Sequence, residues 1–409
     1  MNTTPHSAEE PTAPRIVVIG GGYAGTLAAN RLGAAVRAGA AQVNLVNPRP
    51  LFVHRIRLHQ WATGTGVADA EYGTVLADDG RLVVDTATRI DVAAGRVELA
   101  SGESLPYDQL IYAVGSTGRA PVTIDGVAEH GFVFGDWEVA QELRGHLATT
   151  APASPTTVIG GGFTGIELAA ELAEAGRTVR LVCRGPLAPA FGTRARRIAR
   201  RTLRRLGVEI IEDHRVAAVA ADTVTVVGPD GRMQTLPSVT SIVAAGFGVP
   251  ELAAVSGLRT DPIGRLLADE TLTSIDDPRI VGAGDAVAPS GVPFRMSCQA
   301  ATQLGPHAAD TVLARLRGEA PAPVSVAFVG QCTSLGRHGA VIQGTHRDDT
   351  PARVVISGRT GAALKELVCR SVIWSLRMEK RRPGSSPSVG GQERVLEVPA
   401  GSTASEGII

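Results

Sequence analysis

Short apolar runs that end in glycine-rich turns shape the first half of the chain. Residues 16–19, Ile-Val-Val-Ile, lead directly into the turn at 20–25, Gly-Gly-Gly-Tyr-Ala-Gly, and a mixed apolar and polar stretch follows to about Gly33. A short apolar run bounded by glycine is typical of a buried strand, and the stretch behind it has the spacing of a helix. We therefore expect a strand, a glycine turn and a helix in that order.

The same succession returns 140 residues further on. Residues 157–159, Thr-Val-Ile, lead into Gly-Gly-Gly-Phe-Thr-Gly at 160–165, and the predicted helix behind this turn ends near Gly176, a natural C-cap. Both turns fit G-x-G-x-x-G, in which the first glycine permits the tight bend. The second lets the backbone approach a pyrophosphate, and the third lets the helix pack against the strand. Two such turns predict two bound dinucleotides, and the obvious pair is a flavin dinucleotide and a nicotinamide dinucleotide.

Alternation and turn residues predict the remaining elements. We expect further strands at residues 42–46, 81–84, 96–99, 105–116, 178–182, 208–211 and 279–281, and helices at 194–205, 297–317 and 362–380. They divide the chain into a disordered lead-in at 1–14, a discontinuous FAD-binding domain at 15–120 and 253–320, a nicotinamide-binding domain at 121–252, an α+β region at 321–382 and a disordered tail at 383–409. A length of 409 residues agrees with two or three domains.

Composition and charge narrow the function classes. The formal net charge is zero, so no overall field draws the chain to nucleic acid or to acidic membranes. Seven arginines lie between residues 194 and 205, but no interleaved aromatic residues accompany them, which disfavours nucleic-acid binding. The sequence holds no run of 18 apolar residues and no secretory leader, so a cytoplasmic protein is expected.

The four cysteines argue against two kinds of site. Cys183, Cys298, Cys332 and Cys369 are far apart in the sequence, and no C-x-x-C pattern occurs. A redox dithiol or a zinc site usually shows such close spacing. We therefore expect neither a metal site nor a disulfide reductase, and a reducing compartment fits best.

The residues at two strand ends bear on which nucleotides bind. A dinucleotide site usually carries an acidic residue about 20 residues past the glycines, where it holds a ribose hydroxyl. Asn47 stands there in the first unit, either as an uncharged acceptor for the ribose or as a turn residue before Pro48. The second unit reads Val-Cys-Arg-Gly at 182–185 and offers no carboxylate, whereas Arg184 could meet a 2′-phosphate. The residues alone therefore slightly favour NADPH.

The order of these pieces over residues 15–345 resembles the two-dinucleotide flavoproteins, the superfamily of pyridine nucleotide-disulfide oxidoreductases. The segment ending in Ala113-Val114-Gly115 is similar to the family's strand that ends Ala-Thr-Gly, and residues 281–285 resemble its second FAD motif. The resemblance implies an α/β fold with two Rossmann-like domains of the glutathione reductase type and a small α+β C-terminal region.

Further details are similar to type II NADH dehydrogenases. Residues 51–64 look like the segment that these enzymes place beside the flavin, and Cys298–Gln303 is similar to their A-Q-x-x-x-Q quinone motif. Gln299 and Gln303 are spaced i and i+4, so both belong to one helix face. The resemblance implies an FAD-dependent enzyme that oxidises NADH and passes electrons to a quinone.

The C-terminal region departs from that family, since it lacks long aromatic-rich helices for bilayer docking. The helix at 362–380 has apolar residues at helical spacing with basic neighbours, which is compatible with peripheral contact on the cytoplasmic face of a membrane. A core-packing helix or a helix at a homodimer interface is favoured over this reading.

The expected chemistry is hydride transfer from a nicotinamide to flavin N5, after which the flavin passes its electrons on. Glu167 is expected either to orient the nicotinamide and relay a proton or merely to solvate its helix. His59 is expected either to exchange a proton or to be a packed polar residue, and Gln299 and Gln303 either contact the quinone or are ordinary polar positions. The expected cofactor-binding residues are Gly20, Gly22, Tyr23, Ala24, Gly25, Asn47, Arg55, Ala113, Gly115, Gly284 and Asp285 for FAD, and Gly160, Gly162, Phe163, Thr164, Gly165 and Arg184 for NAD(P)H.

Other function classes stay open at this point. One is a flavin oxidase or dehydrogenase of a small metabolite, with a vestigial second nucleotide fold. Another is a reductase of a ferredoxin-like protein, for which the arginine-rich helix at 194–205 would supply a basic docking face. A third is a redox-sensing protein that binds its nucleotides without turnover.

Overall fold

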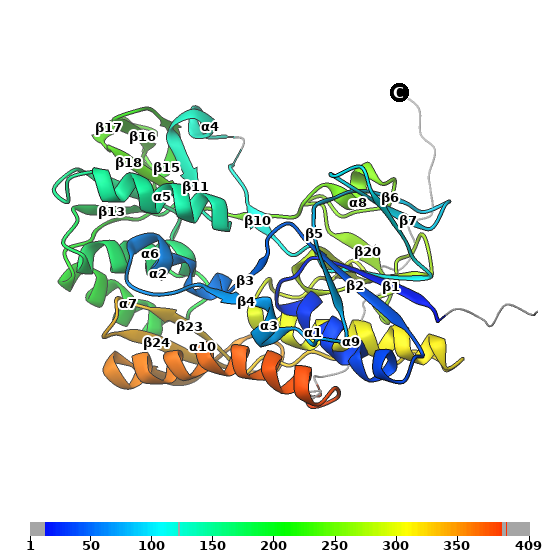
Figure 1. Cartoon of the computed structure of the whole chain (residues 1–409). Helices are drawn as coiled ribbons and strands as arrows, with labels where there is room; N and C mark the ends of the chain where they lie inside the picture. The colour runs from blue at the N-terminus through cyan, green and yellow to red at the C-terminus, as the bar shows by residue number, and fades with distance from the viewer. Residues whose placement is uncertain (1–12, 122, 387–389, 391–409) are drawn as a thin grey trace, which may run out of the picture.

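The computed structural model describes residues 13–121, 123–386 and 390. Two α/β halves lie beside each other, and a small C-terminal sheet with one long helix runs beneath both (Figure 1). The lead-in expected at residues 1–14 falls almost wholly outside the described residues, as does the tail from 391 onward.

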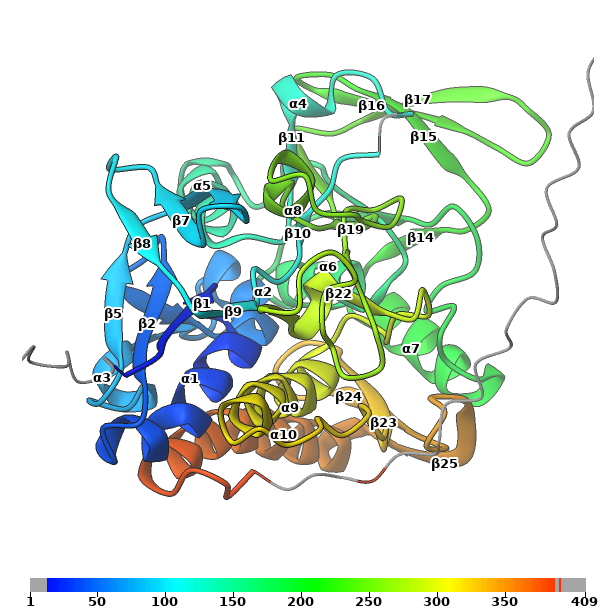
Figure 2. The same ribbon diagram turned by 90° about the vertical axis from the view of Figure 1, so that its right-hand side faces the viewer.

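The first half is built on a parallel sheet in the order β21-β9-β1-β2-β5. Strand β1 is central, and its apolar residues are buried on both faces of the sheet, Ile16 and Val18 in one apolar cluster and Val17 and Ile19 in another. Helices α1 and α9 pack against each other on one side of the sheet (Figure 2). The elements are β1 (Arg15–Ile19), α1 (Tyr23–Arg37), β2 (Gln42–Asn47), β5 (Arg81–Val84), β9 (Gln109–Tyr112), β21 (Ile280–Gly282) and α9 (Cys298–Leu316).

The second half repeats this plan in the order β11-β18-β12-β13-β14, again all parallel. Its arginine-rich helix buries one stripe, Ala195, Ala199 and Leu203, so most of its arginines lie on the outer faces. The elements are β11 (Gly131–Val133), α5 (Trp137–Thr149), β12 (Thr156–Ile159), α6 (Phe163–Glu174), β13 (Val179–Val182), α7 (Thr193–Arg205), β14 (Glu209–Ile211) and β18 (Thr240–Val243).

The halves are joined in two ways. The chain crosses between them at a short antiparallel pair, β10 (Thr117–Gly118) with β19 (Phe247–Gly248). A segment of the first half also reaches across, because α2 (Leu58–Thr63) packs against α5 and α6 of the second half (Figure 1). This segment comprises β3 (Leu51–Val53), η1 (Arg55–Arg57), α2, β4 (Asp69–Glu71) and α3 (Tyr72–Val75).

Smaller elements complete the two halves. An antiparallel sheet of β6 (Ala87–Asp91), β7 (Arg96–Leu99) and β8 (Ser104–Pro106) belongs to the first, and one of β15 (Arg215–Val219), β16 (Thr223–Val227) and β17 (Met233–Pro237) to the second. The rest are α4 (Val127–His130), α8 (Leu252–Val255), β20 (Leu266–Ala268), η2 (Gly284–Ala286) and β22 (Val287–Pro289).

The C-terminal part consists of the antiparallel strands β23 (Gly330–Ser334), β24 (Ala340–Thr345) and β25 (Pro351–Ser357), followed by α10 (Gly358–Arg381). Helix α10 packs on β24 of the same part and on α1 of the first half, and its Lys365 pairs with Glu167 of α6 in the second half. Near its end the buried Glu379 pairs with Arg31 and accepts hydrogen bonds from the backbone of Gly384 and Ser386. The first described residues of the expected tail are therefore bound to the helix.

The predicted fold class is confirmed: two Rossmann-like α/β domains with a small α+β C-terminal region. Two helices are longer than predicted. Helix α1 continues past Gly33 to Arg37, since the alanines behind this glycine are good helix formers, and α10 begins at Gly358 rather than Ala362. The domain boundaries stay predictions, although β10 and β19 lie close to two of them. No helix within the described ranges is both long and apolar enough to span a bilayer.

Candidate active site

A cavity of about 600 Å³ lies between the two halves and the C-terminal part. Its walls come from the first glycine turn, the end of β9, the segment 51–59, the starts of α6 and α9, strand β23 and the inner face of α10. This volume is in the range of small-molecule and cofactor sites. The segment expected beside the flavin does line the cavity.

The first glycine turn combines two tightly packed positions with an open one. Gly20 has φ of +103°, and a Cβ there would clash with the carbonyl oxygen of Ala113; a Cβ at Gly25 would clash with the carbonyl oxygen of Gly20. A Cβ on Gly22 would meet nothing within 4 Å. The outer glycines are thus required by the chain itself, whereas Gly22 leaves room at the N-terminus of α1, where a pyrophosphate would bind.

The second glycine turn likewise combines two tightly packed outer glycines with an open middle glycine. Gly160 has φ of +125° and packs under the carbonyl oxygen of Ala244, and Gly165 packs against Gly160, while Gly162 faces open space. Phe163 and Thr164, the first residues of α6, line the cavity. The turn therefore has the shape that a second pyrophosphate needs, and the residue types at both turns fit dinucleotides.

Asn47 lies at the end of β2, beneath the first turn. Its Oδ1 accepts a hydrogen bond from the Gly21 amide at 3.0 Å, and its Nδ2 donates to the Arg49 carbonyl oxygen at 2.7 Å. The side chain thus holds the turn in place. The second lone pair of Oδ1 is still available to a ribose hydroxyl, so the two expected roles are compatible.

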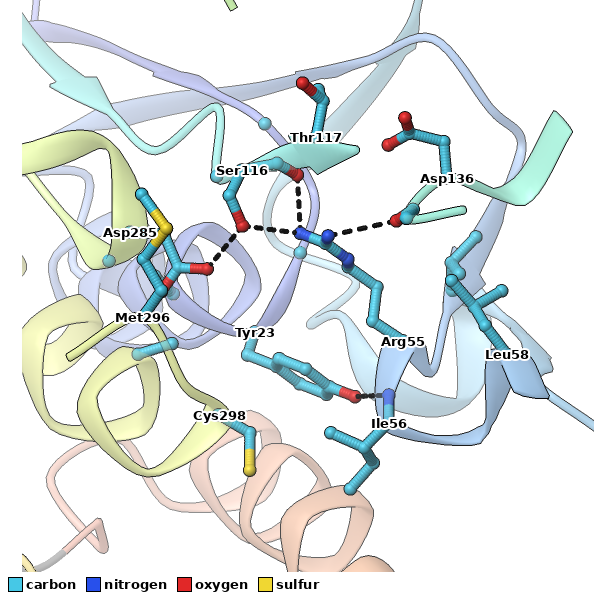
Figure 3. A pocket seen from close by; sticks show the side chains of 18 of the residues that line it. Tyr23, Arg55, Ile56, Leu58, Ser116, Thr117, Asp136, Asp285, Met296 and Cys298 are labelled. Atoms are coloured by element: carbon cyan, nitrogen blue, oxygen red, sulfur yellow. Dashed lines mark hydrogen bonds between the residues drawn. The ribbon is translucent and has the colours of Figure 1, made fainter. Parts of the chain in front are cut away.

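A chain of hydrogen bonds joins Arg55 to Asp285 across the cavity (Figure 3). The Arg55 guanidinium donates to Ser116 O at 2.5 Å, to Ser116 Oγ at 3.0 Å and to Gly135 O at 3.0 Å. Ser116 Oγ donates to Asp285 at 2.7 Å, and the Ser297 amide donates to the other carboxylate oxygen at 3.1 Å. Burial raises the pKa of Asp285, and Arg55 opposes the rise. The expected ribityl contact of Asp285 stays a prediction.

Two further expected FAD positions, Tyr23 and Gly115, also line the cavity. The Tyr23 hydroxyl lies 2.9 Å from His54 Nδ1 and accepts a hydrogen bond from the Ile56 amide. Gly115 follows β9 with φ of +73°, a conformation that L side chains rarely adopt. Ala24, Ala113 and Gly284 complete this wall.

Glu167 forms a buried ion pair with Lys365, which α10 supplies. Glu167 also accepts a hydrogen bond from the Ser334 amide at 3.0 Å, and its other oxygen lies 3.5 Å from His59 Nδ1. His59 Nε2 is 3.3 Å from Ser334 Oγ, which closes the network. Glu167 is therefore not a solvating residue of its helix, and His59 is packed within this network.

The pKa values of the three titratable groups indicate which of them are charged at neutral pH. Burial would raise the pKa of Glu167, but the ammonium of Lys365 and the hydrogen bond from the Ser334 amide hold it below its ordinary value. Burial would lower the pKa of Lys365, but Glu167 raises it. Burial lowers the pKa of His59 to about 4. At neutral pH the cavity wall thus carries a carboxylate, an ammonium and a neutral imidazole.

The two glutamines expected at the quinone site have different surroundings. Gln303 donates to the carbonyl oxygens of Gln299 and Ala327 and accepts from the Ala327 amide, so its side chain is fully used. Gln299 lines the cavity, and its buried Oε1 finds no hydrogen-bond partner among the described residues. Such an acceptor points to a ligand or a water.

Lys365 was not predicted as a site residue, because this lysine is on a helix far from the glycine turns in the sequence. One signal was present: the chain has only two lysines, Lys365 and Lys380, and one of them lies on an apolar helix face. Ser116 and Ser334 were also missed as partners of Asp285 and Glu167, since no motif connects them.

Three of the four cysteines line this cavity, although they are far apart in sequence: Cys298, Cys332 and Cys369. All are free thiols. Burial raises the pKa of Cys298 to about 12 and that of Cys369 to about 11, so these thiols stay protonated at neutral pH and are weak nucleophiles. Spacing in the sequence was therefore a poor guide to their positions. Within the described residues no group of His, Cys, Asp or Glu is arranged to hold a metal ion.

Arg184 lies outside this cavity, exposed in the loop after β13, and Cys183 before it is buried. The expected contact of Arg184 with NAD(P)H stays a prediction.

Comparisons with known proteins agree with this geometry. A family model described as pyridine nucleotide-disulphide oxidoreductase matches residues 14–308. The chain is 30% identical over 385 residues to an NADH dehydrogenase-like protein of Mycobacterium tuberculosis, covering 87% of this chain and 92% of that one. It is 28% identical over 397 residues to a type II NADH:quinone oxidoreductase of Staphylococcus epidermidis, covering 88% and 96%. The structure of NDH2 from Plasmodium falciparum in complex with NADH superimposes with a TM-score of 0.74 at 16% identity, covering 90% and 97%.

Proposed function

Because the chain belongs to the pyridine nucleotide-disulphide oxidoreductase family, we propose that it takes a hydride from NAD(P)H onto bound FAD and passes the electrons to a quinone. One observation carries this proposal above the others. The two halves that line the cavity each contain a glycine turn of the same construction, and in each turn the middle glycine faces open space.

The first turn would hold the FAD pyrophosphate at the N-terminus of α1, with Gly22 giving the backbone amides access to it. Asp285 and Asn47 have the carboxylate and amide oxygens that ribityl and ribose hydroxyls require. Bound in this way, the flavin supplies the hydride acceptor that the protein side chains lack. The second turn would hold the pyrophosphate of NAD(P)H at the start of α6.

The acceptor end of the proposal rests on Gln299 and on the Glu167–Lys365 pair. Reduction of a quinone to a quinol consumes two protons as well as two electrons. Gln299 Oε1 is a buried acceptor without a partner among the described residues, suited to a quinol hydroxyl. Lys365 holds a proton on the cavity wall that it could give to the reduced quinone, and Glu167 could take up a proton from solvent and return it to Lys365, so the pair would deliver protons one at a time.

Anaerobic stopped-flow spectroscopy tests the proposal. The purified yellow protein is mixed with NADH or NADPH, the flavin band near ~450 nm is followed, and the reduced protein is then mixed with a short-chain quinone. Fast bleaching by a nicotinamide and fast recovery with the quinone are expected. Absence of bleaching by either nucleotide would reject the proposal and favour a metabolite dehydrogenase. Bleaching without recovery would reject only the quinone.

We further propose that the outer face of α10 contacts the cytoplasmic face of a membrane, where quinones dissolve. Leu367 and Trp374 on this face are 61% and 62% exposed, and Arg377 and Arg370 lie beside them. A second cavity of about 430 Å³ opens at Trp374 and reaches Cys369, which also lines the first cavity. Apolar side chains flanked by arginines suit an anionic lipid surface.

Co-sedimentation with phosphatidylglycerol vesicles tests this contact. Trp374→Glu and Leu367→Glu should lower the bound fraction severalfold, because each places a negative charge at the lipid surface. Met233→Glu, on β17 at the opposite end of the second half, is the matched control (Figure 1). If the wild type does not bind vesicles and forms a homodimer that these substitutions dissociate, the outer face of α10 contacts a second copy of the chain instead.

A further inference from the structure

We propose that the nicotinamide site prefers NADPH to NADH, and that Arg184 binds the 2′-phosphate. This inference rests on the proposed function, because it concerns which dinucleotide enters the second glycine turn. Its support comes from the end of β13, which differs from the corresponding place in the first half.

The two halves have one corresponding position beneath each glycine turn. In the first half a Cβ on Gly21 would lie 2.9 Å from Asn47 Cγ; in the second half a Cβ on Gly161 would lie 2.7 Å from Cys183 Sγ. Asn47 ends β2, and Cys183 directly follows β13. Cys183 therefore occupies the place in which an NADH site carries the carboxylate that binds the ribose 2′-hydroxyl.

Cys183 cannot replace that carboxylate. Its side chain is 1% exposed and is packed under the turn. Burial is the main cause that raises the pKa of the thiol to about 12, and the charge of the neighbouring Glu212 adds to the rise. The thiol is therefore neutral at any physiological pH. A neutral thiol is a weak hydrogen-bonding group, and it gives the free hydroxyl of NADH little advantage.

The nearby carboxylate of Glu212 is already in use. Its Oε1 accepts from the Leu187 amide and from Arg200 Nη2, both at 2.7 Å, and its Oε2 accepts from Arg200 Nε at 2.9 Å. These bonds fasten the loop after β13 to α7. Asp213, exposed in the turn after β14, is a second acid near Cys183, at the end of the next strand rather than of β13.

Arg184 directly follows Cys183 and is exposed. Its guanidinium has no ion-pair partner among the described residues. A planar guanidinium binds two phosphate oxygens at once, which makes arginine the usual reader of such groups. Arg204 adds positive charge near Glu212, whose own charge is already neutralised by Arg200. The end of β13 thus combines a missing carboxylate with an unpaired arginine, as a 2′-phosphate requires.

Binding of two nucleotide fragments tests this without turnover. Adenosine 2′,5′-bisphosphate and AMP differ only by the 2′-phosphate, and calorimetry on the holoenzyme measures both affinities. We expect the bisphosphate to bind at least ~10-fold more tightly to the wild type. Arg184→Ala should reduce this ratio to within about threefold, whereas Arg197→Ala, an exposed arginine on α7, should leave it unchanged.

Kinetics give a second readout with distinguishable failures. The ratio of flavin reduction rates with NADPH and NADH should exceed ~10 in the wild type and reverse in the double variant Cys183→Asp with Arg184→Ala. Equal affinities for the two fragments, together with flavin reduction by NADH, would overturn this inference and leave the proposed function intact. A loss of NADH binding in Asp213→Asn would then assign the ribose contact to Asp213. No reduction by either nucleotide would reject the proposed function, while the fragments would still report on Arg184.

Discussion

Lys365 and Glu167, separated by 198 positions in the chain, meet in a buried ion pair that joins α10 to α6. The pair ties the C-terminal helix to the second nucleotide fold at the wall of the cavity. Removal of one partner leaves the other charge buried without compensation, which is far more costly than removal of both.

Lys365→Met should therefore lower the free energy of unfolding by about 3–5 kcal/mol. Adding Glu167→Gln should recover much of this loss, because a neutral amide can still accept the hydrogen bond from Ser334. Urea unfolding of the wild type and of the two variants measures both effects. A loss below about 1 kcal/mol in Lys365→Met would show that water reaches the pair.

The buried imidazole of His59 predicts a pH dependence of stability. Its pKa in the folded protein is about 4, below the ordinary 6.5, because burial disfavours the charged form. The stability that neutral His59 contributes is complete above pH 6.5 and is lost as the pH falls toward 4, a change of about 3 kcal/mol.

His59→Gln should flatten the fall in unfolding free energy between these two pH values, since glutamine keeps a donor and an acceptor but does not titrate. Buried His54, whose pKa is likewise lowered to about 4, will preserve part of the slope. Urea titrations at a series of pH values measure the slope. His338→Gln, at an exposed position, is the control, and an identical slope in both variants would contradict the role given to burial.

The open middle glycines predict a separation of folding from cofactor binding. Gly22→Val and Gly162→Val place side chains in empty space at ordinary extended backbone angles, so the melting temperature of the apoprotein should change by only a few degrees. Gly22→Val should lose FAD, measured by the flavin absorbance per chain. Gly162→Val should keep FAD and weaken NAD(P)H binding at least ~10-fold.

The outer glycine Gly165 gives the contrast. Its Cβ would clash with backbone of Gly160, so Gly165→Val should reduce folding yield as well as binding. Normal FAD content in Gly22→Val would mean that the pyrophosphate lies elsewhere.

The two glutamines of α9 predict opposite consequences. Gln303→Leu removes both hydrogen bonds to Ala327 and should lower the unfolding free energy by about 2–3 kcal/mol, since buried backbone groups lose their partners. Gln299→Leu should leave stability within about 1 kcal/mol, because its Oε1 has no partner among the described residues.

Gln299→Leu should instead raise the KM for quinone about 10-fold while flavin reduction by NAD(P)H stays normal. Steady-state kinetics with a short-chain quinone and stopped-flow reduction separate these quantities. The assignment of Gln299 to the acceptor end would be abandoned if only flavin reduction slowed.

The parts of the fold and site that were predictable are local in sequence. Both glycine turns, the strands beside them and the start of α9 behind Ser297 follow from spacing and from caps within a few residues. The Arg55–Ser116–Asp285 chain and the Glu167–Lys365 pair were not predictable, because each joins residues that no periodicity relates. Three cysteines around one cavity were missed for the same reason.

The repeated construction of the two halves has a consequence for how the protein can evolve. Each half carries one residue beneath its own glycine turn, Asn47 in one and Cys183 in the other, and the two do not share contacts. On the proposed assignment of Arg184, changes at positions 183 and 184 would therefore alter which nicotinamide dinucleotide is preferred and leave the residues around the first glycine turn as they are. Such changes would move the source of electrons from the biosynthetic NADPH pool to the catabolic NADH pool while the cavity that receives the electrons keeps its lining residues.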